Sequence, residues 1–530
     1  MRIAVLGGGP GGLFAATLAK SADPGREVTV FERNRAEDTF GFGVVFSDAT
    51  LEGIHAADPV VRDALTEHGV HWDPIEVRLH GERFRCHGNG MAAVERRTLL
   101  GLLQRRAVDA GVDVRFSTEI DPDDILSAGY DLVVASDGAN SRLRDRFSDV
   151  FVPSAETATA KFIWLGTTYP FEGLTFVHQR GPHGVFAVHG YPIGTGVSTF
   201  IVETDEESWR AAGLDEFDAT QPPGPSDEKT KAYLQELFAE QIDGHPLLVN
   251  NSRWGNFRTR RARRWRHRVS GTAIALLGDA AHTAHFSVGS GTKMAMEDAV
   301  ALVAALGEHG DDVDAALVSY EAVRQPQVAK IQNSARPSLS WWEHFGRSHD
   351  ALPAWQFAYH FFTRSLTESK LRRRDDGFVT DVHDRWRDAH GAEPLGSPLD
   401  VAGQRLAGRV VVVGDGAVHL PGGPLPLRPD PPEDGTAWGL RVAAPDTESE
   451  LASALDAVAK GLAAGTALVA TAGGTALTRR LLCEAARLEH GAVSLLVEEV
   501  DPAVAEDVAV TAVLSGRTDL VSAPAEEASA

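Results

Sequence analysis

The feature that most constrains the fold is a run of glycines directly after the first predicted strand. Residues 2–6 are mostly apolar, which predicts a short buried strand, and Gly7-Gly8-Gly9-Pro10-Gly11-Gly12 follows at once. In a GxGxxG motif the first glycine permits a tight turn, the second lets the backbone approach a pyrophosphate, and the third lets helix and strand pack closely. The run therefore predicts a dinucleotide-binding turn that involves Gly7, Gly9, Pro10, Gly11 and Gly12.

An acidic residue stands where such a turn needs one. Glu32 ends the second predicted strand, Glu27–Glu32, twenty residues beyond Gly12, where a carboxylate can bind ribose hydroxyls. A glycine-rich turn alone is the alternative interpretation, but the strand–turn–helix context favours dinucleotide binding. We assign Glu32 and the adjacent Arg33 to the cofactor site.

Two further motifs select FAD over NAD. Residues 137–144 (Asp-Gly-Ala-Asn-Ser-Arg-Leu-Arg) follow one predicted buried strand, and residues 278–282 (Gly-Asp-Ala-Ala-His) follow another. An aspartate at a strand end can accept hydrogen bonds from ribityl hydroxyls, and the N-terminus of a helix can stabilise negative charge on a reduced flavin. Either motif alone is compatible with an Asp–Gly turn, whereas three motifs in this order predict FAD. The residues assigned here are Asp137, Gly138, Asp279, Gly289, Gly291 and Thr292.

The rest of the chain predicts an α/β protein with a doubly wound FAD-binding domain, an antiparallel substrate-binding sheet and a C-terminal α/β domain. Strands alternate with helices up to about residue 136, segments between 155 and 205 resemble antiparallel strands, and a helical segment is expected near 340–390. The expected boundaries are 1–75, 92–150 and 270–350 for the FAD-binding domain, 76–91 and 151–269 for the substrate domain, 351–394 for a helical linker, and 395–530 for the C-terminal domain.

Charge and cysteine content exclude several functional classes. The chain has 51 basic and 74 acidic residues, a net charge of −23, which argues against nucleic acid or an anionic membrane as the main partner. Two separated cysteines, Cys86 and Cys483, predict neither a disulfide framework nor a thiolate metal site. Without a signal peptide or an apolar run of about 18 residues, we expect a cytoplasmic protein. No metal-binding pattern is present, and the sequence leaves the oligomeric state open.

Together the three flavin motifs resemble those of the single-component, group A flavin-dependent aromatic hydroxylases, the para-hydroxybenzoate hydroxylase type. The resemblance covers residues 1–350. It implies that Arg96 or Arg97 lies near the FAD ribityl chain or phosphate, with a solvated helix start as the alternative. It also places Val44 and Val45 beside the flavin.

Other segments resemble a narrower branch that acts on coenzyme A esters. Residues 41–50, 282–299 and 340–343 look like salicylyl-CoA 5-hydroxylases, and 2-aminobenzoyl-CoA monooxygenase/reductases share similar stretches. His285 and Phe286 replace prolines that most group A enzymes have there. The resemblance implies that NADH reduces FAD, that O2 adds to give a C4a-hydroperoxide, and that salicylyl-CoA becomes gentisyl-CoA.

Histidines next to the expected flavin edge are candidates for catalysis, together with Phe286. An imidazole there can hydrogen-bond a phenol or relay its proton; this is the role we favour for His285, whereas for His282 we favour a structural role in the loop. Four alternatives remain open: a 2-aminobenzoyl-CoA hydroxylase, a hydroxylase of free aromatic acids or indoles, an O2-independent flavin reductase, and a non-catalytic FAD-binding scaffold.

A basic run precedes the third flavin motif and consists of Arg258, Arg260, Arg261, Arg263, Arg264, Arg266 and Arg268. We assign Arg258, Arg263 and Arg264 to the phosphates of coenzyme A and Trp265 to stacking on its adenine. The alternative is a solvated strand whose arginines pair with the chain's own carboxylates.

The C-terminal domain resembles the closing units of an old-yellow-enzyme barrel. Residues 395–530 are too few for a full eight-unit barrel of about 250 residues. We therefore expect a shortened, flavin-free domain, in which Val413-Gly414-Asp415-Gly416 forms a turn rather than a nucleotide site.

Overall fold

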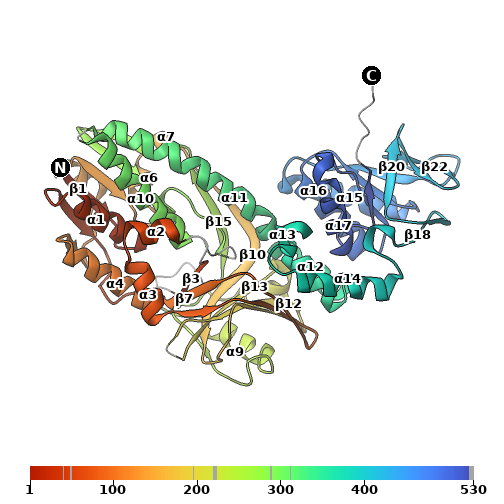
Figure 1. Ribbon diagram of the computed structural model, residues 1–530, viewed down its shortest axis with the longest axis horizontal. Helices are drawn as coiled ribbons and strands as arrows, with labels where there is room; N and C mark the ends of the chain where they lie inside the picture. The colour runs from red at the N-terminus through yellow and green to blue at the C-terminus, as the bar shows by residue number, and fades with distance from the viewer. Residues whose placement is uncertain are drawn as a thin grey trace. The chain divides into compact units, whose positions relative to one another are not determined.

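The structure is a computed structural model that describes residues 1–39, 41–47, 51–194, 196–218, 224–286, 289, 291–310 and 312–523. The chain divides into two compact units. Unit 1 comprises residues 1–78 and 89–343, and unit 2 comprises residues 79–88 and 344–530. Helix α11 (Val313–Ala351) passes from the first unit into the second (Figure 1).

A sheet of mainly parallel strands forms the first layer of unit 1. Its order is β16 (Arg266–Val269), β17 (Thr272–Leu276), β9 (Leu132–Ala135), β1 (Arg2–Leu6), β2 (Glu27–Phe31) and β8 (Asp113–Arg115). Only the β16–β17 pair is antiparallel. The central strands are buried nearly throughout, as a parallel sheet covered by helices requires. Figure 1 shows the helices packed beside it: α1 (Pro10–Ala22) contacts both α4 (Arg96–Asp109) and α10 (Gly291–His309).

An antiparallel sheet forms the second part of unit 1 and confirms the strands predicted between residues 155 and 205. Its strands in unit 1 run β14 (Leu247–Leu248), β10 (Pro153–Thr167), β13 (Ser198–Thr204), β12 (Gly184–Pro192), β11 (Thr175–Gly181) and β5 (Ile75–Leu79), and β15 (Gly255–Ala262) also pairs with β10. Only the β11–β5 pair is parallel. A smaller sheet joins β3 (Gly43–Ser47), β7 (Met91–Glu95) and β4 (Val70–Trp72). The remaining helices of unit 1 are α2 (Glu52–Ala57), α3 (Val60–His68), α5 (Pro122–Ser127), α6 (Arg142–Arg146), α7 (Ser148–Phe151), α8 (Glu206–Ala211), α9 (Glu228–Leu237) and the 3-10 turn η2 (Gly278–Ala280).

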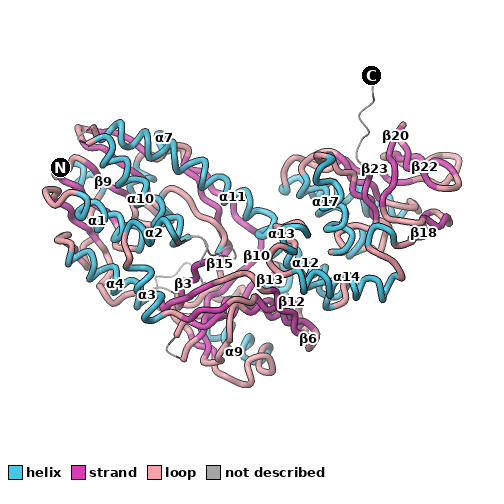
Figure 2. The backbone as a smooth tube through the Cα atoms, viewed as in Figure 1, coloured by secondary structure: helices cyan, strands magenta, loops and turns pink. Residues whose placement is uncertain are grey.

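Unit 2 contains a helical part and a closed barrel. The helices are α12 (Ala354–Phe362), α13 (Glu368–Arg372) and α14 (Asp376–His390), which confirms the helical segment predicted near 340–390. The barrel strands, magenta in Figure 2, are β20 (Val410–Gly414), β21 (Ala417–Leu420), β22 (Gly423–Arg428), β23 (Gly439–Ala443), β24 (Val469–Ala472), β25 (Ser494–Leu496) and β26 (Leu520–Ser522). Helices α15 (Leu451–Ala463), α16 (Ala476–Glu484) and α17 (Pro502–Leu514) connect the last four strands, and the strands β6 (Glu82–Cys86), β18 (Leu399–Val401) and β19 (Gln404–Leu406) complete the unit. Asp415 and Gly416 form the turn of the β20–β21 hairpin, within the segment 413–416 for which a turn was predicted.

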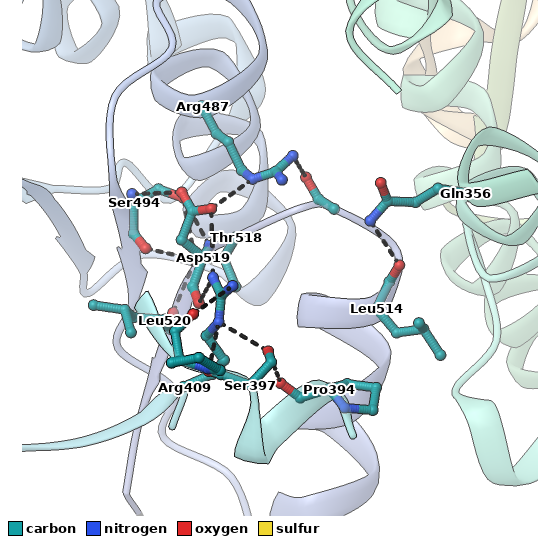
Figure 3. A network of polar contacts seen from close by, with 12 residues as sticks. Gln356, Pro394, Ser397, Arg409, Arg487, Ser494, Leu514, Thr518, Asp519 and Leu520 are labelled. Carbon is teal, nitrogen blue, oxygen red and sulfur yellow. Dashed lines mark hydrogen bonds and ion pairs between the residues drawn. The ribbon is translucent and has the colours of Figure 1, made fainter. Parts of the chain in front are cut away.

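A buried polar network closes the barrel where β26 meets β20 (Figure 3). The Asp519 carboxylate accepts a hydrogen bond from Arg487 Nε at 2.9 Å and another from the backbone nitrogen of Ser494 at 3.1 Å. Arg409 Nε donates to the Ser397 carbonyl at 3.0 Å, and the Arg409 guanidinium lies 4.0 Å from Asp519. Because these residues come from both sides of the closing strand pair, the network fixes the last strand of the chain in the barrel. No helix among the described residues is long and apolar enough to cross a membrane.

The Asp519 network predicts a local stability difference. Asp519→Ala removes the acceptor of Arg487 Nε and of the buried Ser494 backbone nitrogen, so we expect a loss of about 3 kcal/mol of stability confined to unit 2. Asp400→Ala removes an exposed ion pair with Arg405 and is the control, with an effect of about 0–1 kcal/mol. Hydrogen exchange of unit 2 peptides measures both, and equal protection in the two variants contradicts the assignment.

Candidate cofactor and substrate site

Steric limits explain why the turn after β1 has glycine at its first and last positions, Gly7 and Gly12. Gly7 has a φ of +101°, and a Cβ there would lie 2.4 Å from the Ser136 carbonyl oxygen; a Cβ on Gly12 would lie 2.2 Å from the Gly7 carbonyl oxygen. No heavy atom lies within 4 Å of a Cβ built on Gly9, which is the N-cap of α1 and has no capping side chain. The first backbone N–H groups of α1 are therefore open to an anionic group such as a pyrophosphate.

Glu32 holds this turn from the end of β2. Its Oε2 accepts a hydrogen bond from the Gly8 backbone nitrogen at 2.7 Å, and its Oε1 accepts from the backbone and side-chain nitrogens of Asn34 at 2.7 and 2.8 Å. A carboxylate has about four acceptor positions, so capacity for a ribose hydroxyl remains. The adjacent Arg33 is exposed.

The second motif places a partly unsatisfied carboxylate beside the turn. Asp137 Oδ2 accepts a hydrogen bond from the Arg142 backbone nitrogen at 2.9 Å, whereas Oδ1 is buried and has no partner among the described residues. Burial raises the pKa of Asp137, and hydrogen bonds from Ser141 and Arg142 oppose that rise. The Arg144 guanidinium donates to the Ala280 carbonyl at 3.3 Å, so it joins the second motif to the third.

The third motif and the start of α4 bring opposite charges together. Asp279 lies in η2 and is exposed, although protein surrounds it on most sides; this enclosure raises the pKa of its carboxyl, and the charges of His282, Arg96 and Arg260 oppose the rise. Arg96 Nε is buried and lacks a partner among the described residues, while Arg97 is exposed. Of the two arginines considered in the sequence, Arg96 is thus the one that turns inward.

These unsatisfied groups fit FAD. A ribityl chain and pyrophosphate offer hydroxyl donors for the carboxylates and anionic acceptors for Arg96, and an orphaned buried polar atom is costly unless a ligand pairs it. The buried atoms Asp137 Oδ1 and Arg96 Nε meet this description, since neither has a partner among residues described. Gly138, with a φ of +83°, has no heavy atom within 4 Å of a Cβ position, so its face is also open.

The carboxylate of Asp298, which the sequence analysis did not single out, anchors the third motif. It is fully buried on α10, and its Oδ2 accepts hydrogen bonds from the Gly278 backbone nitrogen at 3.0 Å and from His282 Nε2 at 2.7 Å. Its Oδ1 accepts from Arg324 Nε at 2.8 Å. Burial acts to raise the pKa of Asp298, but the charges and hydrogen bonds of His282 and Arg324 lower it overall. The available signal in the sequence was an acidic residue among the apolar residues that follow Gly291.

This anchor corrects the assignment of His282 to catalysis. The His282 ring is 2% exposed, bonds Asp298, and packs 5.0 Å from the Trp265 ring between centroids. The structural role favoured in the sequence analysis therefore accounts for His282.

His285 occupies a second buried cluster, with groups from the antiparallel sheet. Glu203 on β13 lies 2.6 Å from His189 Nε2 and 3.3 Å from His285 Nε2. All three residues are at most 3% exposed. Phe286 is half-buried, and its ring lies near His285 and His189 at centroid distances of 4.2 and 5.6 Å.

An apolar wall surrounds Phe286. Phe162 and Trp164 lie 5.0 and 5.6 Å from its ring, and Val45 packs in the same cluster, whereas Val44 belongs to the larger core. Gly289 is exposed, and Gly291 and Thr292 begin α10 half-buried. Residues 287, 288 and 290, which complete this motif, lie outside the described residues.

Six arginines of the basic run divide into two groups. Arg261, Arg266 and Arg268 bind Gln332, Glu321 and Asp314, which agrees with the solvated-strand interpretation. The side chains of Arg258, Arg263 and Arg264 are exposed and make no ion pair with a described residue.

Trp265 requires a correction. Its side chain is 2% exposed, its Nε1 donates to the Ala262 carbonyl, and its ring packs against His282 and Tyr320. No face is open for an adenine ring, so the assignment to coenzyme A stacking was wrong. A tryptophan between arginines gave no sign in the sequence of being a core residue.

Comparison with known proteins extends these findings. Residues 1–335 match the family described as FAD binding domain. The chain is 59% identical to salicyloyl-CoA 5-hydroxylase from Streptomyces sp over 526 residues, which are 98% of this chain and 99% of that protein. It is 37% identical to 3-hydroxy-4-methyl-anthranilyl-[aryl-carrier protein] 5-monooxygenase from Streptosporangium sibiricum, over 64% of this chain and 89% of that one.

A solved structure supports the fold. The crystal structure of a mutant of 2-methyl-3-hydroxypyridine-5-carboxylic acid oxygenase matches with a TM-score of 0.51 at 22% identity, covering 65% of this chain and 93% of that one. The likeness confirms the predicted α/β fold with its doubly wound domain.

The inward position of Arg96 predicts an effect on cofactor affinity. Arg96→Ala removes a buried charged donor, so we expect FAD to bind about 10- to 100-fold more weakly. Arg97→Ala, one residue along and exposed, is the matched control and leaves the affinity unchanged. Flavin fluorescence titration measures both dissociation constants, and equal constants for the two variants exclude Arg96 from the cofactor site.

Proposed function

Because the chain belongs to the FAD-binding-domain family of flavin-dependent aromatic monooxygenases, we propose that it hydroxylates salicyloyl-CoA at ring position 5. The proposed cofactor is FAD, and the proposed co-substrates are NADH and O2. The product is gentisyl-CoA, in which the new hydroxyl stands para to the original one.

One observation carries the proposal: the identity of 59% extends over 98% of the chain and therefore includes the C-terminal unit. The 37% identical relative covers only 341 residues, but its name also describes a 5-monooxygenase of an aromatic acyl group on a carrier. Hydroxylation at position 5 of a carrier-bound aromatic acyl group is thus common to both names.

We propose that FAD is held by the residues that converge in unit 1. The α1 N-terminus at Gly9 takes the pyrophosphate, Glu32 takes the ribose, and Asp137, Asp279 and Arg96 take the ribityl and phosphate groups. Bound FAD supplies the redox chemistry, accepting hydride from NADH and activating O2 for transfer to the ring. The N–H groups at the start of α10, from Gly291 onward, stabilise negative charge on the flavin ring.

Side chains of unit 1 surround the place where the substrate ring is proposed to bind. Phe286, Phe162 and Trp164 form an apolar wall that excludes water from the reacting groups. Asp298 keeps the loop of the third motif in place through Gly278 and His282. His285 lies in the same loop, next to Phe286, and is the candidate to hold the ring hydroxyl.

Coenzyme A provides phosphates for the exposed arginines. Guanidinium groups bind phosphate in a bidentate geometry, and Arg258, Arg263 and Arg264 are the members of the basic run whose side chains lie exposed on β15 and the turn after it. We also propose a cytoplasmic location, supported by the two free cysteines, Cys86 and Cys483.

A substrate panel tests this function. Purified protein with FAD is given NADH or NADPH together with salicyloyl-CoA, salicylate or 2-aminobenzoyl-CoA, and oxygen uptake and product mass are recorded. We expect uptake coupled to a product 16 mass units heavier with salicyloyl-CoA and NADH, in agreement with addition of one oxygen atom. Faster turnover of free salicylate, or NADH oxidation without oxygen uptake, contradicts the proposal.

The exposed arginines generate a separate prediction. Arg263→Ala with Arg264→Ala removes two phosphate-binding candidates, so the KM for salicyloyl-CoA should rise about tenfold or more while kcat changes little. Arg266→Ala, whose side chain pairs with Glu321, is the matched control. A KM unchanged in the double variant removes coenzyme A recognition from this segment.

A further inference from the structure

Two histidines and an aspartate meet in unit 2, outside the candidate cofactor site. They are His80, in the turn between β5 and β6, and His349 and Asp350, in the last turn of α11. One ligand atom from each residue, an imidazole nitrogen or a carboxylate oxygen, lies within 4.8 Å of the other two. Sequence motifs do not reveal this group, because His80 and His349 are far apart in the chain.

The backbone of the β5–β6 turn fixes the position of His80. His80 and Gly81 have φ values of +51° and +80°, and a two-residue type I′ hairpin turn requires a positive φ at both of these central positions. Histidine is one of the few residues other than glycine that are enriched in this conformation. The side chain of His80 is exposed, so its imidazole can rotate toward a metal ion.

Contacts on several sides orient the His349 ring. Its Nδ1 lies 2.7 Å from Asp350 Oδ1, and the residue is 2% exposed. The His80 ring lies nearly perpendicular to it at a centroid distance of 4.8 Å, and Phe357 of α12 packs at 6.3 Å. His349 is therefore a buried imidazole in a defined orientation, whereas the Asp350 side chain, 54% exposed, lies on the solvent side of the group.

These donor atoms match the ligand preferences of Zn²⁺. Zinc binds imidazole nitrogen and carboxylate oxygen at about 2.0–2.2 Å, which places the ligand atoms of a tetrahedral site roughly 3.4 Å apart. Side-chain rotation that moves the donor atoms of the exposed His80 and Asp350 by about 1 Å gives that spacing. Mg²⁺ and Ca²⁺ prefer oxygen ligands, so a group with two imidazoles disfavours them.

We propose that His80, His349 and Asp350 form a zinc site in unit 2. The three side chains supply three ligands, and a water molecule takes the fourth position on the exposed side. The metal joins the β5–β6 turn to the end of α11 and stabilises both segments against local unfolding, because it binds the folded state alone. The flavin motifs belong to unit 1, so the proposal is independent of the proposed function.

Zinc titration of the tag-free, FAD-loaded protein tests the site. A chromophoric chelator competes for Zn²⁺, and its absorbance gives the stoichiometry and the dissociation constant. We expect one Zn²⁺ to bind per chain and an excess of Mg²⁺ not to displace it. Hydrogen exchange locates the site: Zn²⁺ should protect peptides from residues 79–88 and 344–357, while the flavin content of the protein stays unchanged.

The two exposed ligands allow variants that keep the fold. His80→Asn removes the imidazole but retains a residue suited to the left-handed turn, and Asp350→Asn removes the charge at nearly the same volume. Each should weaken Zn²⁺ binding by at least about tenfold and remove the protection from exchange. His419→Asn, which replaces another exposed histidine of unit 2, is the matched control and should bind Zn²⁺ as the wild type does.

The outcomes distinguish a zinc site from a simple hydrogen-bonded pair. Loss of affinity in His80→Asn and Asp350→Asn, but not in His419→Asn, supports the site. Equal Zn²⁺ affinity in the wild type and both ligand variants overturns it, because the metal then binds elsewhere on the chain. Failure of the wild-type protein to bind one Zn²⁺ also overturns it, and the contact between His349 and Asp350 is then only a hydrogen bond. None of these results changes the expected hydroxylation of salicyloyl-CoA.

Discussion

The organisation of unit 1 depends on one buried carboxylate, that of Asp298. An ionised carboxylate inside a protein is stable only when charged or polar donors surround it, and Asp298 has three of them: the Gly278 backbone, His282 and Arg324. These donors belong to η2, to the loop that follows it, and to α11. Because Asp298 lies on α10, it fixes the start of that helix relative to the third flavin motif, and with it the loop that carries His285 and Phe286.

The site is assembled from segments that are far apart in the sequence. The turn at Gly7, the carboxylates of Asp137 and Asp279, and the cation of Arg96 come from the ends of different elements, and Arg144 connects the second motif to the third. The antiparallel sheet contributes the apolar wall and Glu203, which reaches the loop of the third motif through His285. Unit 1 thus contains two buried carboxylates next to this loop: Asp298 holds the loop in place, and Glu203 lies against His285.

The sequence predicts those parts of the site whose residues are needed for interactions with near neighbours in the chain. Glycines at Gly7 and Gly12 are needed for backbone reasons that act within a few residues, so their spacing is visible in the chain. Glu203 and His189 could not be predicted, because their meeting depends on the register between two strands and on a loop more than 80 residues later. Trp265 was misassigned for a related reason: its burial follows from contacts with His282 and Tyr320, which are distant in sequence. The sequence does not distinguish the adjacent Arg96 and Arg97, and only the fold shows which of the two faces inward.

The central claim is that this chain inserts one atom of molecular oxygen into the ring of an aromatic thioester. The most direct measurement is a single turnover with salicyloyl-CoA and NADH under ¹⁸O-labelled O2, followed by mass spectrometry of the product. We expect one labelled oxygen on the ring, at position 5, with one NADH oxidised for each product formed. An unlabelled product, or NADH oxidation without any change in the thioester, would contradict it.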